Sequence, residues 1–433
     1  MKTFYTVLIL LLLGAGGVFA QQRYVPSAEN LKNRAEFQDM KFGVFIHWGI
    51  YSMMADGEWI LNNKNINYKE YAKLAQGFYP SKFNAAKWVS DVKAAGAKYI
   101  CITSRHHDGF SMFGTKQSPY NIVDATPFKR DVIKELADEC HKQGIKLHFY
   151  YSLLDWGRTD YNPLGRTGKG VGRTDMGNWA SYYQFMLNQL TELLTNYGEI
   201  GAIWFDGQWD QPSDFDWKLR DIYDHIHSIQ PGCLVINNHH LAPTEGEDGQ
   251  TFEKDLPGHN TTGFSADAEI GQLPLETCET MNNSWGYNIT DLKYKSEKEL
   301  IHYLVKTAGN NANLLMNVGP RPNGTFSDIA IERYMAMGDW LKQYGETIYG
   351  TRGGLVGPHD WGVTTQKGNT LYVHVLNLAD NALYLPLGDK KVRSAKTFIG
   401  KKTVKYTDVP GGAVLQFDKA PDETDYVVQV ELK

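Results

Sequence analysis

One aspartate has the surroundings of a reactive carboxylate. Asp206 lies near the end of the run 203–207 (IWFDG), in which three apolar residues precede it and Trp204 lies close by. A carboxylate at the end of an apolar strand can serve as a nucleophile or as a general acid. The alternative is a turn that Asp206 forms with Gly207, a common structural use of this pair. Because a turn needs no tryptophan, the sequence favours the functional interpretation.

Two later segments offer a second carboxylate for paired acid–base chemistry. The first, 245–255 (EGEDGQTFEKD), holds five acids, and we expect most of them to be solvated loop charges. One of them could act as a proton donor, and the pattern alone does not say which. The acids are Glu245, Glu247, Asp248, Glu253 and Asp255. The second segment, 276–287 (ETCETMNNSWGY), adds Glu276 and Glu279.

A pair of adjacent histidines follows another apolar run. His106 and His107 follow 97–104 (AKYICITS) after one intervening residue, Arg105, and precede Asp108. Helical metal sites place two histidines four residues apart, and that spacing is missing here. Binding of a polar ligand such as a polyol is therefore favoured over a metal, with plain structural packing as the remaining alternative.

Two further dipeptides each place a hydrogen-bonding group beside an indole. They are His47-Trp48 and Glu58-Trp59. Sugars need this combination, because their C–H faces lie on aromatic rings while their hydroxyls need fixed polar partners. Trp204 and Trp285 strengthen the pattern, and the alternative is tryptophans in the core with polar residues at the rim.

The elements that carry these residues alternate between strands and helices from about residue 42 to 344. Six continuous apolar runs predict parallel strands covered on both faces, at 42–49, 97–104, 146–152, 201–207, 234–238 and 313–320. Amphipathic stretches that end at glycine predict the helices between them. Polar residues at five successive strand ends favour a (β/α)8-like (TIM) barrel, somewhat irregular, over an open sheet.

The remainder of the chain has a different pattern. Residues 351–433 alternate in short strands with Gly, Asp and Pro turns, which predicts a C-terminal antiparallel β-sandwich domain. Residues 1–20 have a positive start, an apolar run at 7–13 and small residues before position 21, as in a secretory signal peptide. We therefore expect a leader at 1–20, the barrel at 21–350 and the sandwich at 351–433.

Composition limits the possible partners and the location of the protein. The 433 residues carry 44 Lys+Arg against 49 Asp+Glu, a formal charge of −5, so no basic footprint for nucleic acid exists. No segment after the leader reaches the length of a membrane span, and the residue directly after the leader is Gln21, not a cysteine that could carry a lipid. We expect a periplasmic or secreted protein without membrane insertion. The number of subunits stays open.

Taken together, the motifs resemble glycoside hydrolase family 29, the α-L-fucosidases. The resemblance rests on six segments that occur in the family's order, at 42–52, 104–110, 149–156, 203–207, 276–287 and 311–324. It implies a (β/α)8-like barrel followed by a β-sandwich, and fucosylated oligosaccharides or glycoconjugates as substrates. It also implies a retaining double displacement that needs no metal and no cofactor.

The resemblance also implies roles for individual residues. Asp206 matches the nucleophile, Glu253 matches the usual place of the acid/base, and Glu276 is the fallback for that role. Positions that match sugar-binding groups of the family are His47, Glu58, His106, His107, Tyr151 and Trp285. Trp48 and Trp59 fall beside these positions, Trp204 precedes the nucleophile by two residues, and His239 stands where some members have an arginine.

Two other classes of function stay open at this point. A non-catalytic fucose-binding barrel would use the same aromatic residues but would need no nucleophile. A metallohydrolase would use His47, His106, His107 and Asp206 as ligands, and its activity would be lost on chelation.

Overall fold

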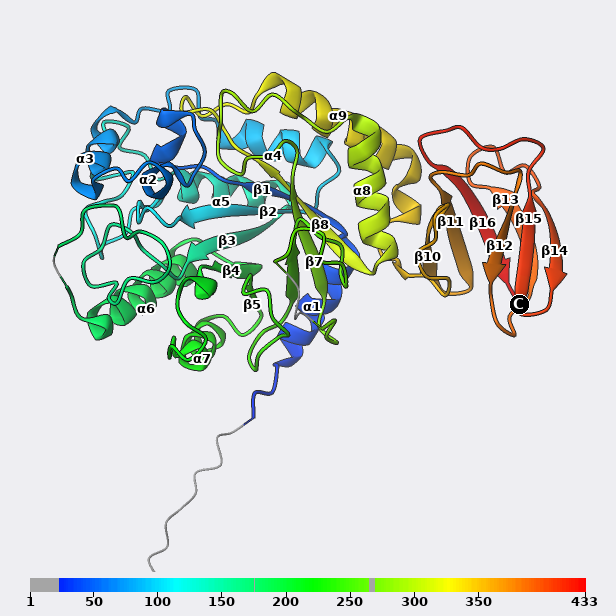
Figure 1. The fold of residues 1–433 in the computed structure, drawn as a ribbon, viewed down its shortest axis with the longest axis horizontal. Helices are drawn as coiled ribbons and strands as arrows, with labels where there is room; N and C mark the ends of the chain where they lie inside the picture. Colours follow the sequence, from blue (N-terminus) through cyan, green and yellow to red (C-terminus); the bar gives the residue numbers. More distant parts are fainter. Residues whose placement is uncertain (1–22, 175, 265–268) are drawn as a thin grey trace, which may run out of the picture.

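The larger part of the molecule is a barrel of eight parallel strands. The structure is a computed structural model that describes residues 23–174, 176–264 and 269–433 (Figure 1). Neighbouring strands pair in the order β5-β4-β3-β2-β1-β8-β7-β6, all parallel. An isolated parallel bridge from Ile236 to Gly249 links β5 to the segment before β6 and brings the ring close to closure. The predicted barrel is therefore confirmed, and the expected leader at 1–20 lies outside the described residues.

The barrel strands and helices follow one another along the chain. The strands are β1 (Phe42–Ile46), β2 (Tyr99–Arg105), β3 (Lys146–Ser152), β4 (Ala202–Asp206), β5 (Leu234–Asn237), β6 (Gln250–Glu253), β7 (Leu275–Thr280) and β8 (Ala312–Val318). The principal helices are α1 (Ala28–Met40), α4 (Ala85–Ala94), α5 (Val132–Gln143), α6 (Trp179–Asn196), α7 (Leu219–Ile229), α8 (Glu297–Gly309) and α9 (Asp328–Tyr344). Short helices α2 (Ile60–Asn63) and α3 (Tyr68–Ala72) lie between β1 and α4.

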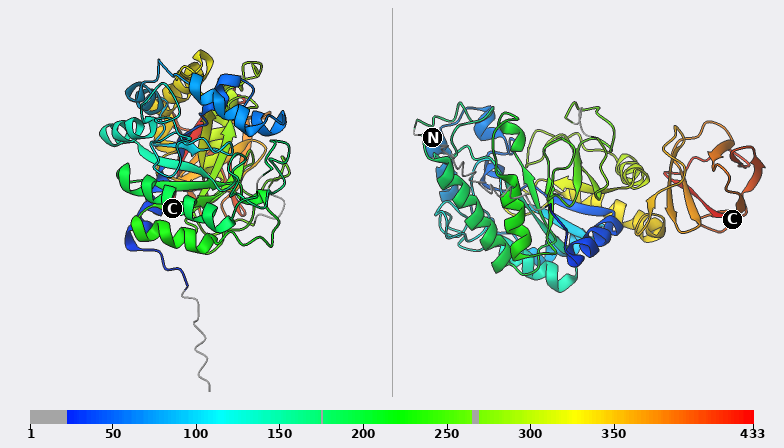
Figure 2. Two further views of the ribbon diagram at one scale, coloured as in Figure 1. Left: turned by 90° about the vertical axis from the view of Figure 1, so that its left-hand side faces the viewer. Right: turned by 90° about the horizontal axis from the view of Figure 1, so that it is seen from below.

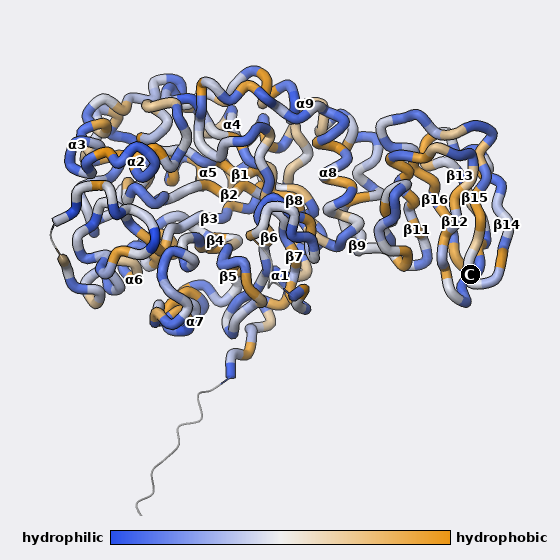
Figure 3. The backbone as a smooth tube through the Cα atoms, viewed as in Figure 1, coloured by the Kyte–Doolittle hydropathy of each residue, from blue (hydrophilic) through white to orange (hydrophobic). Residues whose placement is uncertain are grey.

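Alternation along each strand sorts side chains into two cores. Phe45, Tyr150 and Trp204 belong to a cluster inside the barrel, whereas Phe149 and Tyr151 pack with the surrounding helices. Both faces of the strands are apolar because helices cover the outside and aromatic rings fill the inside. Figure 3 shows this as hydrophobic colouring along β1, β2 and β8.

The segment expected to be a solvated acidic loop is instead partly buried structure. Strands β6 and β7 are not among the six predicted strands, and the prediction of solvated charges is wrong for most acids in 245–255. Glu247 accepts hydrogen bonds from Tyr223 and Thr244, and Asp248 forms ion pairs with Arg34 and His227. Among the described residues no helix separates β5 from β6 or β6 from β7, so the barrel is irregular on this side.

The C-terminal strands form two antiparallel sheets. One has the order β13-β16-β11-β10-β9 and the other β12-β15-β14. The strands are β9 (Arg352–Gly353), β10 (Gly362–Lys367), β11 (Thr370–Val375), β12 (Ala382–Pro386), β13 (Val392–Thr397), β14 (Lys405–Val409), β15 (Gly412–Gln416) and β16 (Tyr426–Leu432). Val373, Leu415 and Val428 meet in their shared core, which makes the predicted sandwich.

The sandwich lies at one end of the barrel, beside α8 and α9 (Figures 1 and 2). His302 of α8 contacts the backbone oxygen of Thr424 at 2.6 Å, and Gly309 at the end of α8 packs against Val363 of β10. Within the described part of the chain, no helix has the length and apolar character needed to cross a membrane.

Candidate active site

A cavity of about 320 Å³ lies at the C-terminal mouth of the barrel strands. Its walls are largely aromatic, and several carboxyl and imidazole groups face into it. The lining residues are Phe45, His47, Glu58, Trp59, His106, Tyr150, Arg166, Trp204, Asp206, Trp209, Asn238, His240, Glu253, Phe264, Cys278 and Trp285. They come from five of the eight strands and the loops that follow, which is how barrel enzymes assemble a site.

Asp206 is held as an ionised carboxylate at the end of β4. Its Oδ1 accepts hydrogen bonds from the backbone N–H of Gly207 and from Nε1 of Trp209, both at 2.8 Å. Its Oδ2 accepts from the Tyr150 hydroxyl at 2.9 Å and lies 3.4 Å from Nε2 of His107. Gly207 adopts φ 96°, a left-handed conformation that turns the chain immediately after the carboxylate.

These donors decide the charge of the group. Burial alone would raise the pKa of Asp206, but the hydrogen bond and charge of His107, with hydrogen bonds from Trp209 and Tyr150, lower this pKa to about 2. Every donor favours the charged form, so the carboxylate stays ionised at neutral pH.

Glu253 has the opposite electrostatics at the end of β6. Burial and then the negative charge of Asp206 raise the pKa of Glu253 to about 7. The Asn238 amide connects the two groups, because its Nδ2 donates to Glu253 Oε2 at 2.8 Å and lies 3.5 Å from Asp206 Oδ1. A protonated acid therefore lies beside an ionised carboxylate, the division of roles that acid–base catalysis requires.

Two histidines in the cavity are neutral. Burial lowers the pKa of His47 to about 3 and that of His106 well below its ordinary value. Nδ1 of His47 lies 2.7 Å from Oδ1 of Asn317, whose Nδ2 donates to the Trp285 carbonyl. Nδ1 must therefore carry the proton, which leaves Nε2 as a hydrogen-bond acceptor.

The remaining walls combine rings with one more buried acid. Trp59 stacks on Trp209 with ring centroids 5.6 Å apart, and Trp285 lies 5.1 Å from the His47 ring. Glu58 accepts a hydrogen bond from the Gly286 N–H at 2.7 Å, and burial raises its pKa. Flat apolar faces with inward polar groups suit a sugar ring.

Similarity to known proteins agrees with this geometry. A family model described as alpha-L-fucosidase matches residues 12–346. The chain belongs to the α-L-fucosidase family. It is 31% identical to the plasma alpha-L-fucosidase of Homo sapiens over 81% of this chain and 78% of the relative. The range matched by the family model includes the barrel strands and every cavity residue named above.

Solved structures of family members share the fold. Isoenzyme 1 from Paenibacillus thiaminolyticus superposes with a TM-score of 0.83 at 31% identity, covering 94% of this chain and all of that one. A GH29 α-L-fucosidase from Bacteroides thetaiotaomicron, described as a trapped covalent intermediate with a 2-fluoro-fucosyl fluoride, gives 0.81 at 26% identity, covering 93% and 96%. The barrel followed by the sandwich is thus the architecture of the family.

Several residues expected at the site lie elsewhere, and the reason is side-chain direction. Tyr151 points away from the barrel, where its hydroxyl donates to Gln189 of α6, and Tyr150 occupies the cavity instead. Strand alternation sends neighbouring residues to opposite faces, so a shift of one position exchanges the two tyrosines.

The same kind of correction applies to a histidine and a tryptophan. His239 lies beside Glu247 with its Nε2 3.0 Å from Oε1, away from the cavity, which His240 lines. Trp48 is fully buried among Phe83 and Trp88 and supports the wall from behind. Apolar surroundings in the sequence did not distinguish a core indole from one that faces the cavity.

His107 also lies outside the lining, packed behind Asp206.

Among the described residues, no group of three or more His, Cys, Asp or Glu side chains is arranged to hold a metal ion.

Four groups that contact the candidate catalytic carboxyls were not predicted from the sequence. They are Tyr150, Trp209, Asn238 and His240, whose Nε2 lies 3.8 Å from Glu253 Oε2. For two of these residues the sequence contains a pattern that could have indicated the site. Trp209 follows Asp206 by three residues, and Asn238 follows a strand as Asp206 ends one.

Glu276 lies inside the barrel below the cavity and does not line it. Its two oxygens accept hydrogen bonds from the Tyr99 hydroxyl at 2.7 Å and from Nε1 of Trp204 at 2.8 Å. Burial raises the pKa of Glu276 to about 7, although both hydrogen bonds oppose the shift. The side chain therefore fixes the Trp204 ring and has no path to a leaving group.

Replacing Glu276 with glutamine tests this assignment. The unfolded chain releases the Glu276 proton near pH 4.5, whereas the folded protein retains it to about pH 7, so this group makes the wild type lose stability as pH rises between those values. The variant lacks that loss, and its free energy of unfolding relative to wild type should rise by up to about 3 kcal/mol from pH 5 to pH 8. Denaturant unfolding of both proteins measures it. A fall in turnover as large as that of a Glu253 variant would contradict the assignment.

Proposed function

We propose that this protein is an exo-acting α-L-fucosidase that removes terminal α-L-fucosyl residues from oligosaccharides or glycoconjugates by a retaining double displacement. The observation that carries the proposal is the Asn238 amide between Asp206 and Glu253. Nδ2 of Asn238 lies 3.5 Å from Asp206 Oδ1 and 2.8 Å from Glu253 Oε2. The distance between these two carboxyl oxygens therefore cannot exceed the sum of the two contacts. Retaining glycosidases need carboxyls about 5–5.5 Å apart, whereas inverting ones leave about 6.5–9.5 Å for a water.

In the first step, a carboxylate oxygen of Asp206 attacks the anomeric carbon while Glu253 gives its proton to the departing glycosidic oxygen. The bond to the leaving group breaks and an ester bond to Asp206 forms. In the second step, Glu253 takes a proton from water, the water oxygen attacks the anomeric carbon, and the Asp206 carboxylate leaves. The proton that Glu253 gives in the first step is regained in the second.

The cavity supplies contacts for one sugar. His47 offers an acceptor through Nε2, and Glu58 offers a carboxyl at the same wall. Phe45, Trp204 and Trp285 provide apolar faces suited to the C–H groups and the methyl of a deoxyhexose. A closed floor of aromatic rings admits a terminal residue and not an internal one, which supports exo action.

We also propose that residues 1–20 direct export to the periplasm or the medium, and that the catalytic unit extends from 21 to 350. The sequence pattern of 1–20 supports the first statement. The position of α9 as the last barrel helix before β9 supports the second.

The stereochemistry of the first product tests the function. Proton NMR during hydrolysis of an aryl α-L-fucoside should show α-L-fucose accumulating first, with the β anomer appearing only through mutarotation, because two displacements restore the configuration. An initial β anomer would establish inversion, and no release of fucose would remove the activity itself.

A further inference from the structure

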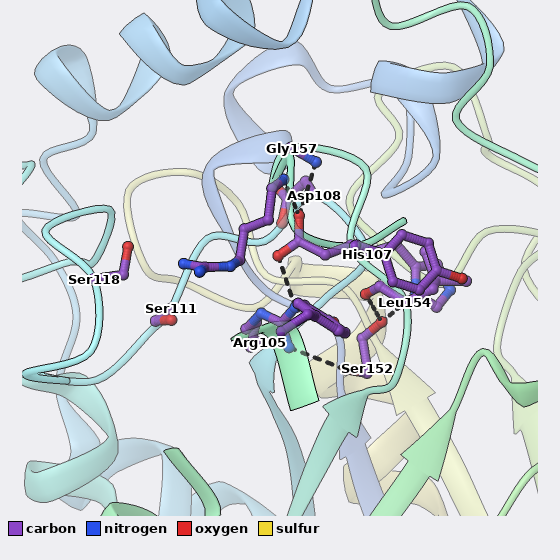
Figure 4. A network of polar contacts seen from close by, with 12 residues as sticks. Arg105, His107, Asp108, Ser111, Ser118, Ser152, Leu154 and Gly157 are labelled. Atoms are coloured by element: carbon purple, nitrogen blue, oxygen red, sulfur yellow. Dashed lines mark hydrogen bonds and ion pairs between the residues drawn. The ribbon is translucent and has the colours of Figure 1, made fainter. Parts of the chain in front are cut away.

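His107 is buried beside Asp206, and its hydrogen bonds indicate which charge the imidazole ring carries. The inference drawn from them rests on the proposed role of Asp206 as the nucleophile. Nδ1 of His107 lies 2.7 Å from Oγ of Ser152 on β3. The Ser152 hydroxyl in turn donates to the Leu154 carbonyl at 2.6 Å. Figure 4 shows this chain of contacts at the end of the strand.

The hydrogen-bonding partners in the series His107–Ser152–Leu154 determine which atoms carry protons. A carbonyl oxygen only accepts, so the single proton of the Ser152 hydroxyl points to Leu154. Oγ of Ser152 must then accept from His107, and Nδ1 of His107 must carry a proton. The other ring nitrogen, Nε2, faces Oδ2 of Asp206 at 3.4 Å. Two acceptors would oppose each other there unless Nε2 carries a proton as well.

The surroundings of the ring favour a positive charge. Three indole rings pack around His107 with centroids 5.2–5.7 Å away, those of Trp59, Trp156 and Trp209. The titratable groups that act on the ring from the neighbouring elements are Asp206, Glu58, Asp108, His47, His106 and Tyr150. Asp206 is ionised and the other two histidines are neutral, so attraction to a cation dominates.

The backbone around Ser152 is held firmly. Arg105 donates from one guanidinium nitrogen to the Ser152 carbonyl at 3.0 Å and from another to Asp155 at 2.7 Å. Oδ1 of Asp155 accepts from the Gly157 N–H at 2.8 Å, which fixes the turn after Leu154. Ser152 and Asp206 are also partners across β3 and β4. The acceptor for Nδ1 therefore cannot move away without disturbing the strand end.

We propose that Ser152 is a positioning residue that holds His107 as a doubly protonated imidazolium, with its Nε2–H facing the nucleophile Asp206. Ser152 has no contact with the cavity and acts through His107. Negative charge leaves the carboxylate when it attacks and returns to it when it departs from the ester. The imidazolium therefore lowers the barrier to breakdown of the ester, and sugar binding depends on it little.

Nitrogen NMR of the histidine side chains reads the charge directly and does not depend on turnover. In protein labelled with ¹⁵N-histidine, the signals missing from a His107→Gln variant identify His107. Both of its ring nitrogens should be protonated at pH 7 in the wild type. In Ser152→Ala, the pH at which the ring loses its second proton should fall by about one to two units, the range expected when a charged group loses a hydrogen bond. A singly protonated His107 in the wild type overturns the proposal, as does an unchanged titration in the variant.

Ser104→Ala is the matched control. Ser104 is a buried serine on the adjacent strand whose hydroxyl also donates to a strand carbonyl, that of Tyr150, at 2.7 Å. Its hydroxyl is hydrogen-bonded to Tyr150, whereas the hydroxyl that faces Nδ1 of His107 is that of Ser152. The control should leave the His107 titration in place, and a shift equal to that of Ser152→Ala would mean that any buried hydroxyl has this effect.

Kinetics give an independent readout. With dinitrophenyl α-L-fucoside, the leaving group needs no proton, so ionisation of Glu253 does not limit the first step. Breakdown of the ester then limits kcat, so the fall of kcat at high pH should report His107 and should move to lower pH in Ser152→Ala. We expect kcat and KM to fall together by about tenfold, while kcat/KM, which reports the first step, stays nearly unchanged. An unmoved profile overturns the proposal, whereas inactivity of the wild type would refute the proposed function and leave the NMR result standing.

Discussion

Replacement of Asp206 with glycine is expected to reduce kcat for an aryl α-L-fucoside by roughly 10⁴- to 10⁶-fold. The reason is that no other group in the cavity can take its place. Glu253 is bound to Asn238 and carries a proton, and Glu58 is occupied by the Gly286 N–H. Steady-state kinetics with the purified variant measure the loss.

Added azide separates a lost nucleophile from a damaged fold. In Asp206→Gly, azide can attack the anomeric carbon from the side that the carboxylate occupied, while the leaving group departs as usual. The product is then β-L-fucosyl azide, inverted from the substrate. Asp206→Asn is the isosteric control, because it keeps the volume but blocks entry of azide. Full activity of either variant, or an α-azide from the glycine variant, would remove Asp206 from its role.

The sequence predicts the ends of the strands better than the direction of the side chains that follow them. Asp206 and His47 are identified because each ends an apolar run beside an aromatic residue, and the barrel places such ends at one rim. Tyr150 and Tyr151 are both preceded by apolar residues, so only the paired strands decide which one faces inward. His239 and His240 pose the same problem beyond β5.

The sequence also does not predict which acidic side chains are buried. The run 245–255 has the composition of a solvated loop, yet Asp248 within it contacts Arg34 and His227. Arg34 is more than 200 positions away in the sequence and His227 about 20. Because these partners are distant in sequence, no local pattern reveals them. Glu276 shows the reverse case, where a carboxyl that matches a catalytic motif is fully occupied by Tyr99 and Trp204.

Replacement of Glu253 with alanine is expected to affect substrates according to their leaving groups. With a natural fucoside, whose departing alkoxide needs a proton, kcat/KM should fall about 10²- to 10⁴-fold, the usual contribution of general acid catalysis. With a dinitrophenyl fucoside, the first step should proceed nearly as in the wild type. The second step should then be slow, because water lacks its base, and the fucosyl ester should accumulate in a burst.

The pH profile follows from the protonation state that the first step uses. Burial and the charge of Asp206 raise the pKa of Glu253 to about 7, and only the protonated form donates. The kcat/KM of a natural fucoside should therefore fall as pH rises through about 7. With the dinitrophenyl substrate this fall should be absent or displaced, because proton donation is no longer needed.

Azide distinguishes the two glutamates. It needs no base, so it should speed breakdown of the ester in Glu253→Ala and give α-L-fucosyl azide, with two inversions on the path. Glu276→Ala should show no azide effect, since Glu276 lies below the Trp204 ring with both oxygens bonded. The opposite pair of results would transfer the acid/base role to Glu276. An azide of β configuration from Glu253→Ala would mean that no ester forms and that the double displacement is wrong.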